Sequence, residues 1–98
     1  MKVIWTEQAL AHLIEFQDFI ARANPAAAER LLGRIVERGD GLAKLPGMGR
    51  TVPELPGTGV REIIEGHYRI VYRILARVIQ VLTVVEGHRH FPVQDVSE

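Results

Sequence analysis

The stretch Val60–Val85, VREIIEGHYRIVYRILARVIQVLTVV, decides the fold, because apolar and polar residues alternate along it. A period of two, with many β-branched and aromatic residues, indicates strands. The short links Glu65-Gly66-His67 and Ala76-Arg77 imply that neighbouring strands pair antiparallel. The expected strands are Val60 to Glu65, Tyr68 to Leu75 and Val78 to Val85.

Two helices are predicted upstream of these strands. After a short strand, Lys2 to Trp5, Thr6 is a natural N-cap, and apolar residues at helical spacing extend the first helix to near Ala23. Asn24 and Pro25 suit the cap and first position of a second helix, which should end near Ala43. So short a connection predicts an antiparallel helical hairpin.

The segment from Lys44 to Gly59 is dense in proline and glycine, so we expect a turn-rich loop without a regular element. The chain is therefore predicted to be an α+β protein of order β-α-α-β-β-β. Its helical hairpin would cover one face of a mainly antiparallel sheet and leave the other face for solvent or a partner. We expect one domain over residues 1–92 and a C-terminal tail over 93–98.

Composition narrows the function. The chain has 98 residues, 47% of them hydrophobic, and a mean hydropathy of +0.06, which excludes disordered, collagen-like and coiled-coil proteins. Twelve basic and twelve acidic residues give a net charge of +0, which disfavours a dedicated nucleic-acid binder. Cysteine is absent, the N-terminus does not resemble a signal peptide, and the uncharged stretch Val78–Val85 is too short to span a bilayer. We expect a soluble, cytoplasmic protein.

Five features of the sequence occur together: Trp5-Thr6-Glu7, Asn24-Pro25 before an alanine-rich helix, Pro46-Gly47-Met48-Gly49-Arg50, Val60-Arg61-Glu62-Ile63 and Tyr68-Arg69-Ile70-Val71-Tyr72-Arg73. Together they resemble the RelE/ParE superfamily of toxins from type II toxin–antitoxin systems, and its ParE, or plasmid-stabilisation, branch most of all. The resemblance covers roughly Met1 to Pro92. It implies no cofactor and a hetero-oligomer with an antitoxin.

The resemblance implies two possible activities. RelE-type members cut mRNA on the ribosome without metal, using a basic cluster with a tyrosine, whereas ParE-type members inhibit DNA gyrase and are held inactive by a ParD-type antitoxin. The RelE cluster maps onto Arg61, Arg69 and Arg89 of this chain, but Ile63 stands where that cluster has a second lysine. No aromatic residue follows Phe91 to match its C-terminal tyrosine.

Several residues have both a functional and a structural interpretation. Arg61, Arg69 and Arg73 could bind a target, or could form a solvated face paired with Glu62 and Glu65. His88 and His90 could be an acid–base pair or surface loop residues, and metal binding is disfavoured because no third ligand lies nearby.

We therefore expect a ParE-like gyrase inhibitor, neutralised by a ParD-like antitoxin. The alternative is a RelE-like mRNA endonuclease that uses Arg61, Arg69, Arg89 and one of His88 or His90. That alternative fails if Arg61 and Arg69 are paired with Glu62, Glu65 or Glu86. Candidates for target binding are Arg61, Arg69, Arg73, Arg89 and His90, and candidates for antitoxin binding are Phe16, Phe19 and Ile20.

Overall fold

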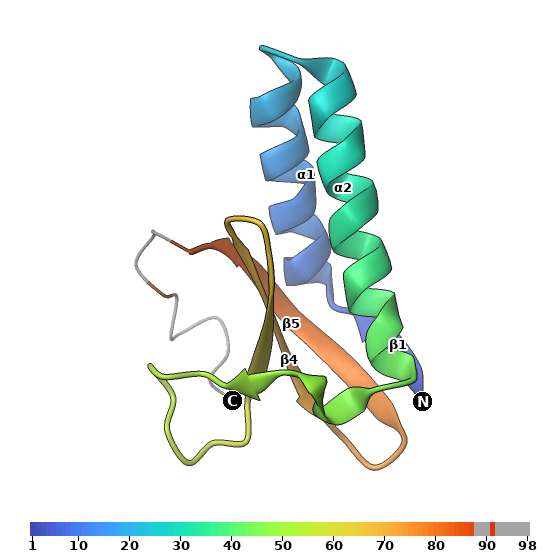
Figure 1. The fold of residues 1–98 in the computed structure, drawn as a ribbon, viewed down its shortest axis with the longest axis vertical. Helices are drawn as coiled ribbons and strands as arrows, with labels where there is room; N and C mark the ends of the chain where they lie inside the picture. The colour runs from blue at the N-terminus through green and yellow to red at the C-terminus, as the bar shows by residue number, and fades with distance from the viewer. Residues whose placement is uncertain (88–90, 92–98) are drawn as a thin grey trace.

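A computed structural model describes residues 1–87 and Phe91. Two long helices stand side by side and lean on a twisted sheet, while a looped segment lies at the other side of the sheet (Figure 1). The elements are β1 (Lys2–Trp5), α1 (Glu7–Ala21), α2 (Pro25–Asp40), the 3₁₀ turns η1 (Gly41–Ala43) and η2 (Pro46–Met48), β2 (Arg50–Thr51), β3 (Arg61–Glu65), β4 (Tyr68–Ile74) and β5 (Val78–Glu86).

The predicted helical hairpin is confirmed, together with both of its caps. The Thr6 hydroxyl accepts a hydrogen bond from the amide of Ala9, and the Asn24 side chain accepts one from Ala27, so each cap satisfies an otherwise unpaired amide. The first helix ends at Ala21, two residues earlier than expected. The second ends at Asp40, and residues 41–43 continue as a tighter 3₁₀ turn.

The sheet has the order β1-β5-β4-β3-β2. All neighbouring strands pair antiparallel except β1 and β5, which are parallel. In this order the first strand, β1, lies at one edge of the sheet. The three predicted strands are confirmed to within one residue. The expectation that the 44–59 loop holds no regular element is wrong, because Arg50 and Thr51 pair with Glu62 and Arg61 as the other edge strand.

A β-bulge lies in β5 opposite β4. Val71 pairs with Thr83 and Tyr72 with Val81, so Leu82 is the extra residue in β5. Thr6 lies beside this bulge, and its hydroxyl is 2.9 Å from the carbonyl oxygen of Val81. One side chain thus caps α1 and anchors the start of that helix to the sheet.

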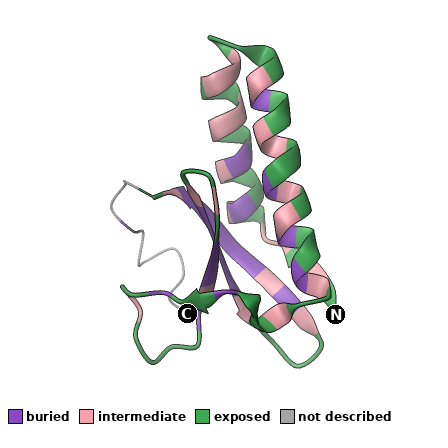
Figure 2. Ribbon diagram, viewed as in Figure 1, coloured by how far each residue is buried: buried purple, intermediate pink, exposed green. Residues whose placement is uncertain are grey.

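Both faces of the sheet are covered, and buried residues run along β4 and β5 (Figure 2). The main core lies between the helices and the sheet and includes Leu13, Ile35 and Ile70. The expectation that the opposite face is open is wrong, because loop residues close a second apolar cluster there. That cluster contains Val52, Val60, Val71, Leu82, Val85 and Phe91, with Leu55 packed against it.

Within the described part of the chain, no helix combines the length and the apolar character needed to cross a membrane.

Candidate functional site

Four side chains of alternating charge are linked on the sheet face opposite the helices, and together they are called the chain of charges: Arg50, Glu62, Arg69 and Glu54. Glu62 of β3 is 1% exposed, and its two carboxylate oxygens each receive a guanidinium. Arg69 of β4 donates from Nε to Glu62 Oε1 at 2.6 Å, and Arg50 of β2 donates from Nε to Oε2 at 2.7 Å. A buried carboxylate is tolerated only when its charge and its lone pairs are satisfied, and here three adjacent strands satisfy them.

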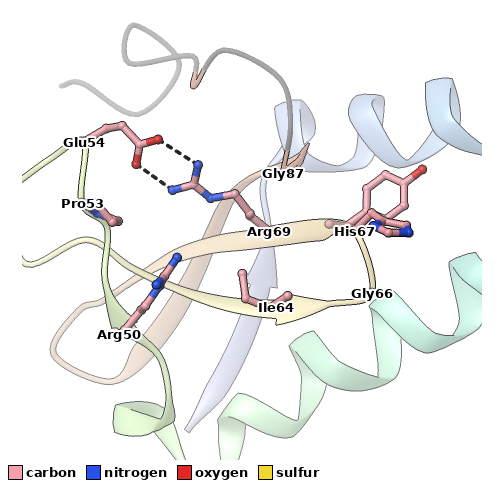
Figure 3. Close-up of a pocket in the computed structure, with 9 residues that line it drawn as sticks. Arg50, Pro53, Glu54, Ile64, Gly66, His67, Arg69 and Gly87 are labelled. Carbon is pink, nitrogen blue, oxygen red and sulfur yellow. Dashed lines mark hydrogen bonds and ion pairs between the residues drawn. The ribbon is translucent and has the colours of Figure 1, made fainter.

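The outer end of this chain of charges comes from the loop that follows β2. Both terminal nitrogens of Arg69 donate to Glu54, at 2.9 and 2.7 Å, in a bidentate pair (Figure 3). The Phe91 ring lies 4.8 Å from the Arg69 guanidinium carbon, which is the arrangement of a cation–π contact. Arg69 is therefore enclosed by two carboxylates and an aromatic ring, and it is only 8% exposed.

The ion pair between Glu54 and Arg69 shifts the pKa values of both residues. The two hydrogen bonds from Arg69 lower the pKa of the Glu54 carboxyl to about 2. The hydrogen bonds to Glu54 raise the pKa of Arg69 above its already high value. Both groups stay charged at neutral pH, so Arg69 is neither a general base nor an unpaired cation.

Arg61 lies on the face of the sheet opposite Arg69. In the pairing of β3 with β4, Arg61 pairs with Tyr72, whereas Arg69 pairs with Ile64. Partners in a ladder share a face, and positions 61 and 64 lie an odd number of residues apart, so Arg61 and Arg69 project from opposite faces of the sheet. The sequence-predicted pair is therefore not brought together.

Arg61 and Tyr72 hold the segment that leads into β2. Arg61 donates to the Gly49 carbonyl oxygen at 2.7 Å, and the Tyr72 hydroxyl accepts from the Gly49 amide at 2.9 Å. Tyr72 also donates to the Pro46 carbonyl oxygen at 2.7 Å, and burial raises the pKa of its hydroxyl, so this proton stays in place. Gly49 is required here, since a Cβ atom would lie 2.6 Å from both the Tyr72 hydroxyl and the Glu62 carbonyl oxygen.

Of the remaining sequence-predicted target residues, the structure describes Arg73. Arg73 is half-buried and donates from Nε to the Gln80 side chain at 2.8 Å. His88, Arg89 and His90 lie outside the described residues.

A groove of about 710 Å³ runs between the second half of α1 and the adjoining ends of β4 and β5. The predicted antitoxin-binding residues Phe16, Phe19 and Ile20 all line it. Phe16 packs against Tyr68, with ring centroids 4.9 Å apart, whereas Phe19 is 73% exposed. An exposed aromatic ring at the mouth of a groove is typical of an interaction surface.

The importance of Glu54 was missed from the sequence. The available signal was that Glu54 is the single acidic residue between Lys44 and Gly59. Glu62 was named, but only as a cross-strand partner of surface arginines and not as a fully buried carboxylate.

A pocket of about 330 Å³ opens beside the outer end of the chain of charges (Figure 3). Arg50, Glu54 and Arg69 form part of its wall, together with Ile64 and His67. Across residues 1–87 and Phe91, no three histidine, aspartate or glutamate side chains are arranged to hold a metal ion.

Comparison with known proteins gives relatives over most of the chain. Y4kP of Sinorhizobium fredii is 36% identical over 95 residues, covering 93% of each chain. Toxin RelE2 of Caulobacter vibrioides is 31% identical over 89 residues, covering 90% of this chain and 97% of the relative.

Two solved structures share the fold. A chain from the chromosomal ParDE toxin–antitoxin system of P. aeruginosa matches with a TM-score of 0.74 at 26% identity, covering 88% of this chain and 95% of that one. A chain of the RelBE2 toxin–antitoxin complex from Mycobacterium tuberculosis matches with a TM-score of 0.62, covering 87% and 95%. At 24% identity, the second match shows the fold alone.

A family model described as the ParE toxin of the type II toxin–antitoxin system parDE matches residues 3–91. This match runs from Val3 in β1 to Phe91 and includes both helices and strands β2 to β5. The chain therefore belongs to the ParE toxin family, within the RelE/ParE superfamily of type II toxin–antitoxin toxins.

Proposed function

We propose that this toxin acts on DNA gyrase as a ParE-type inhibitor, through a protein–protein contact, and that a ParD-like antitoxin neutralises it. The observation that carries the proposal is the enclosure of Arg69 by Glu54 and Glu62. The family match and the P. aeruginosa ParDE structure support the same choice.

The chemistry of RNA cleavage explains why the enclosure matters. Cleavage without metal needs cations that reach the phosphate and groups that move protons to and from the reacting oxygens. The guanidinium of Arg69 is neutralised by carboxylates, and that of Arg61 projects from the other face and is bonded to Gly49. Ile63, at the position of the second RelE lysine, is buried in the main core. The charge pattern thus favours a toxin that works by binding.

The gyrase contact is assigned to the side chains that remain outside the chain of charges. Arg73 is the strongest described candidate, because this half-buried residue near the end of β4 lies outside the chain of charges. The C-terminal candidates Arg89 and His90 lie outside the described residues. Arg61 and Arg69 would support that surface by holding the loops around it.

The antitoxin is assigned to the groove beside α1. Phe16 and Tyr68 pack together in its lining, and Phe19 in the same lining is exposed, so an apolar side chain of the antitoxin would cover Phe19 on binding. The toxin would then exist as a hetero-oligomer with its antitoxin until that partner is lost.

A DNA gyrase supercoiling assay with the purified chain tests the proposal. Inhibition at micromolar toxin should be relieved when the cognate antitoxin is added back. Phe19→Ser should still inhibit gyrase but should require more antitoxin for relief, whereas Arg73→Ala should lose inhibition and keep antitoxin binding. Protein that circular dichroism shows to be folded, yet that leaves supercoiling unaffected, would contradict the gyrase proposal.

A RelE-like mRNA endonuclease is the second candidate, and the 31% identity to Toxin RelE2 favours it. It is tested by incubating the chain with programmed ribosomes and mapping the mRNA ends. Cleavage that is lost in Arg69→Ala and His90→Ala would support this activity in place of the first.

A further inference from the structure

The segment Pro53–Gly59, called the strap below, crosses the sheet face opposite the helices and is held mainly by its own turns. Its hydrogen bonds are local, such as Leu55 N to the Val52 carbonyl at 3.0 Å and Thr58 Oγ1 to the Leu55 carbonyl at 2.7 Å. Among the described residues, the bidentate pair from Arg69 to Glu54 provides the only hydrogen bonds between the strap and a strand of the sheet. The strap is therefore fastened at one polar point.

The strap turns at two glycines, and a separate hydrogen bond closes its base. Gly57 and Gly59 have φ values of 78° and 81°, a region that glycine enters without steric strain. Leu55, the strap's one contribution to the second apolar cluster, is only half-buried there. Val52 and Val60 are joined by a backbone hydrogen bond of 3.1 Å that closes the base of the loop. Displacing the strap would leave that base in place.

The two carboxylates around Arg69 differ in how readily they could be replaced. The Glu62 side chain is 0% exposed and is also bonded to Arg50, so it belongs to the sheet. The Glu54 side chain is 39% exposed, and among residues 1–87 and Phe91 its ion pair is with Arg69 alone. If Glu54 left, the two terminal nitrogens of Arg69 would remain, fixed by Glu62 and by Phe91, in a fork that matches a carboxylate.

Room for an incoming side chain lies directly beside this point. The pocket of about 330 Å³ is bounded by Arg50 and Arg69 on the polar side and by Ile64, 44% exposed, on the apolar side (Figure 3). An acidic residue in an apolar stretch of chain fits both walls. A nucleic acid fits less well, because the chain has a net charge of +0 and lacks the basic field that phosphate binding needs.

We propose that the strap covers a carboxylate-binding site centred on Arg69, in which Glu54 occupies the place of an acidic side chain from a partner protein that displaces the strap. The site is separate from the groove beside α1. It can exist whether gyrase or the ribosome is the target, and it is tested by carboxylate binding, whereas the proposed function is tested by supercoiling, so the two failures are distinguishable.

Chemical rescue of Glu54→Ala tests the site with a small carboxylate. We expect this variant to melt below the wild type by no more than about 4–8 °C, because the lost pair is partly exposed to solvent. Sodium acetate should restore part of the loss, whereas sodium chloride at equal ionic strength should not. Glu29→Ala, which removes an exposed carboxylate from α2, is the matched control and should show neither effect.

A strap peptide supplied in trans gives the second measurement. The acetylated peptide Val-Pro-Glu-Leu-Pro copies residues 52–56 and should bind the Glu54→Ala protein at least about tenfold more tightly than the same peptide with glutamine, since a charge-assisted bidentate pair is lost. Hydrogen exchange at the Leu55 and Thr58 amides should be faster in Glu54→Ala and should stay fast when the peptide binds, because the peptide takes the place of the strap.

Three results would overturn the proposal. Equal affinity for the glutamate and glutamine peptides would show that Arg69 does not select a carboxylate. Unchanged exchange at the strap of Glu54→Ala would show that Glu54 does not fasten it. Stronger rescue by inorganic phosphate than by acetate would make it a phosphate site.

Discussion

On one face of the sheet, two helices bury an apolar core that contains Ile35, Ile63 and Ile70. On the other face, the cover is a loop, and part of what it covers is the charged set Arg50, Glu62, Arg69 and Glu54. Apolar contacts are many and individually weak, so the first face tolerates conservative changes. Ionic contacts in a buried site are few and interdependent, so the second face should fail when a single member is lost.

Removing the central carboxylate should have the largest effect. Glu62→Ala leaves the buried Arg69 with one counter-charge and opens a cavity between β2 and β4, so we expect unfolding free energy to fall by about 3–5 kcal/mol in urea denaturation. Glu65→Ala is the matched control on the same strand. Its partners Arg34 and Arg38 have side chains 54% and 40% exposed, so its loss should stay below about 1 kcal/mol. Similar losses for both variants would remove the distinction between the faces.

The helix-covered face is tested by truncating the largest fully buried side chain that the described helices α1 and α2 contribute. Ile35 of α2 is 1% exposed, and Ile35→Ala should cost about 2–5 kcal/mol of unfolding free energy through lost burial and a residual cavity. The conservative change Ile35→Val should cost only about 0.5–1.5 kcal/mol. The same urea titration should therefore show a graded loss of stability at Ile35. At Glu62 on the second face we expect no such gradation, because no substitution keeps both the negative charge and the side-chain length.

A smaller loss is expected from a hydroxyl that joins the sheet to the segment before β2. Tyr72→Phe keeps the ring in the core but leaves the Gly49 amide and the Pro46 carbonyl without their partner. We expect a loss of about 1–2 kcal/mol of unfolding free energy. If thermal melting and urea denaturation both show no change, then water satisfies these groups and the contact is not structural.

Acid should loosen the strap-covered face selectively. The folded-state pKa of Glu54 is about 2, below the ordinary carboxyl value, so its stabilising contribution is complete above about pH 4.5 and is lost as pH falls towards 2. Because Glu54 is partly exposed, the contribution is discounted to about 1 kcal/mol or less. The difference in unfolding free energy between wild type and Glu54→Gln should therefore shrink across that pH range. A difference that stays constant from pH 5 to pH 2 would contradict the assigned pair.

The smallest effect on stability is expected outside both cores. Phe19 is 73% exposed, and Phe19→Ser should change unfolding free energy by no more than about 0.5 kcal/mol. Urea denaturation of this variant also provides the folding control for the antitoxin titration described above. A loss of 2 kcal/mol or more would mean that Phe19 belongs to the core.

Local patterns predicted the helix-covered face well. The caps Thr6 and Asn24 and the alternation in β3, β4 and β5 act over a few residues, and the elements they indicate were found within one to three residues of their expected bounds. The tight hairpin at Gly66 could also have shown that Arg61 and Arg69 lie on opposite faces of the sheet. The pairing of Glu65 with Tyr68 fixes the register of both strands, and this register pairs Arg69 with Ile64, three residues from Arg61.

The strap-covered face could not be predicted in the same way. β2 is two residues long, and Glu54 lies 15 residues from Arg69, so no periodicity links them. The closure of this face depends on the turns around Pro53 and Gly57 and on side chains that meet only after the sheet has formed. The composition of residues 44–59 predicted a turn-rich loop, but it did not indicate which face of the sheet this loop would cover.

Parallel assays of one folded preparation test the central claim, that a sequestered Arg69 leaves this toxin a gyrase inhibitor and not a ribosome-dependent nuclease. The wild-type chain is added to a gyrase supercoiling reaction and to programmed ribosomes at the same concentrations, with and without antitoxin. The account predicts loss of supercoiling that antitoxin restores, together with intact mRNA. Cut mRNA that depends on Arg69, with supercoiling unaffected, would contradict it.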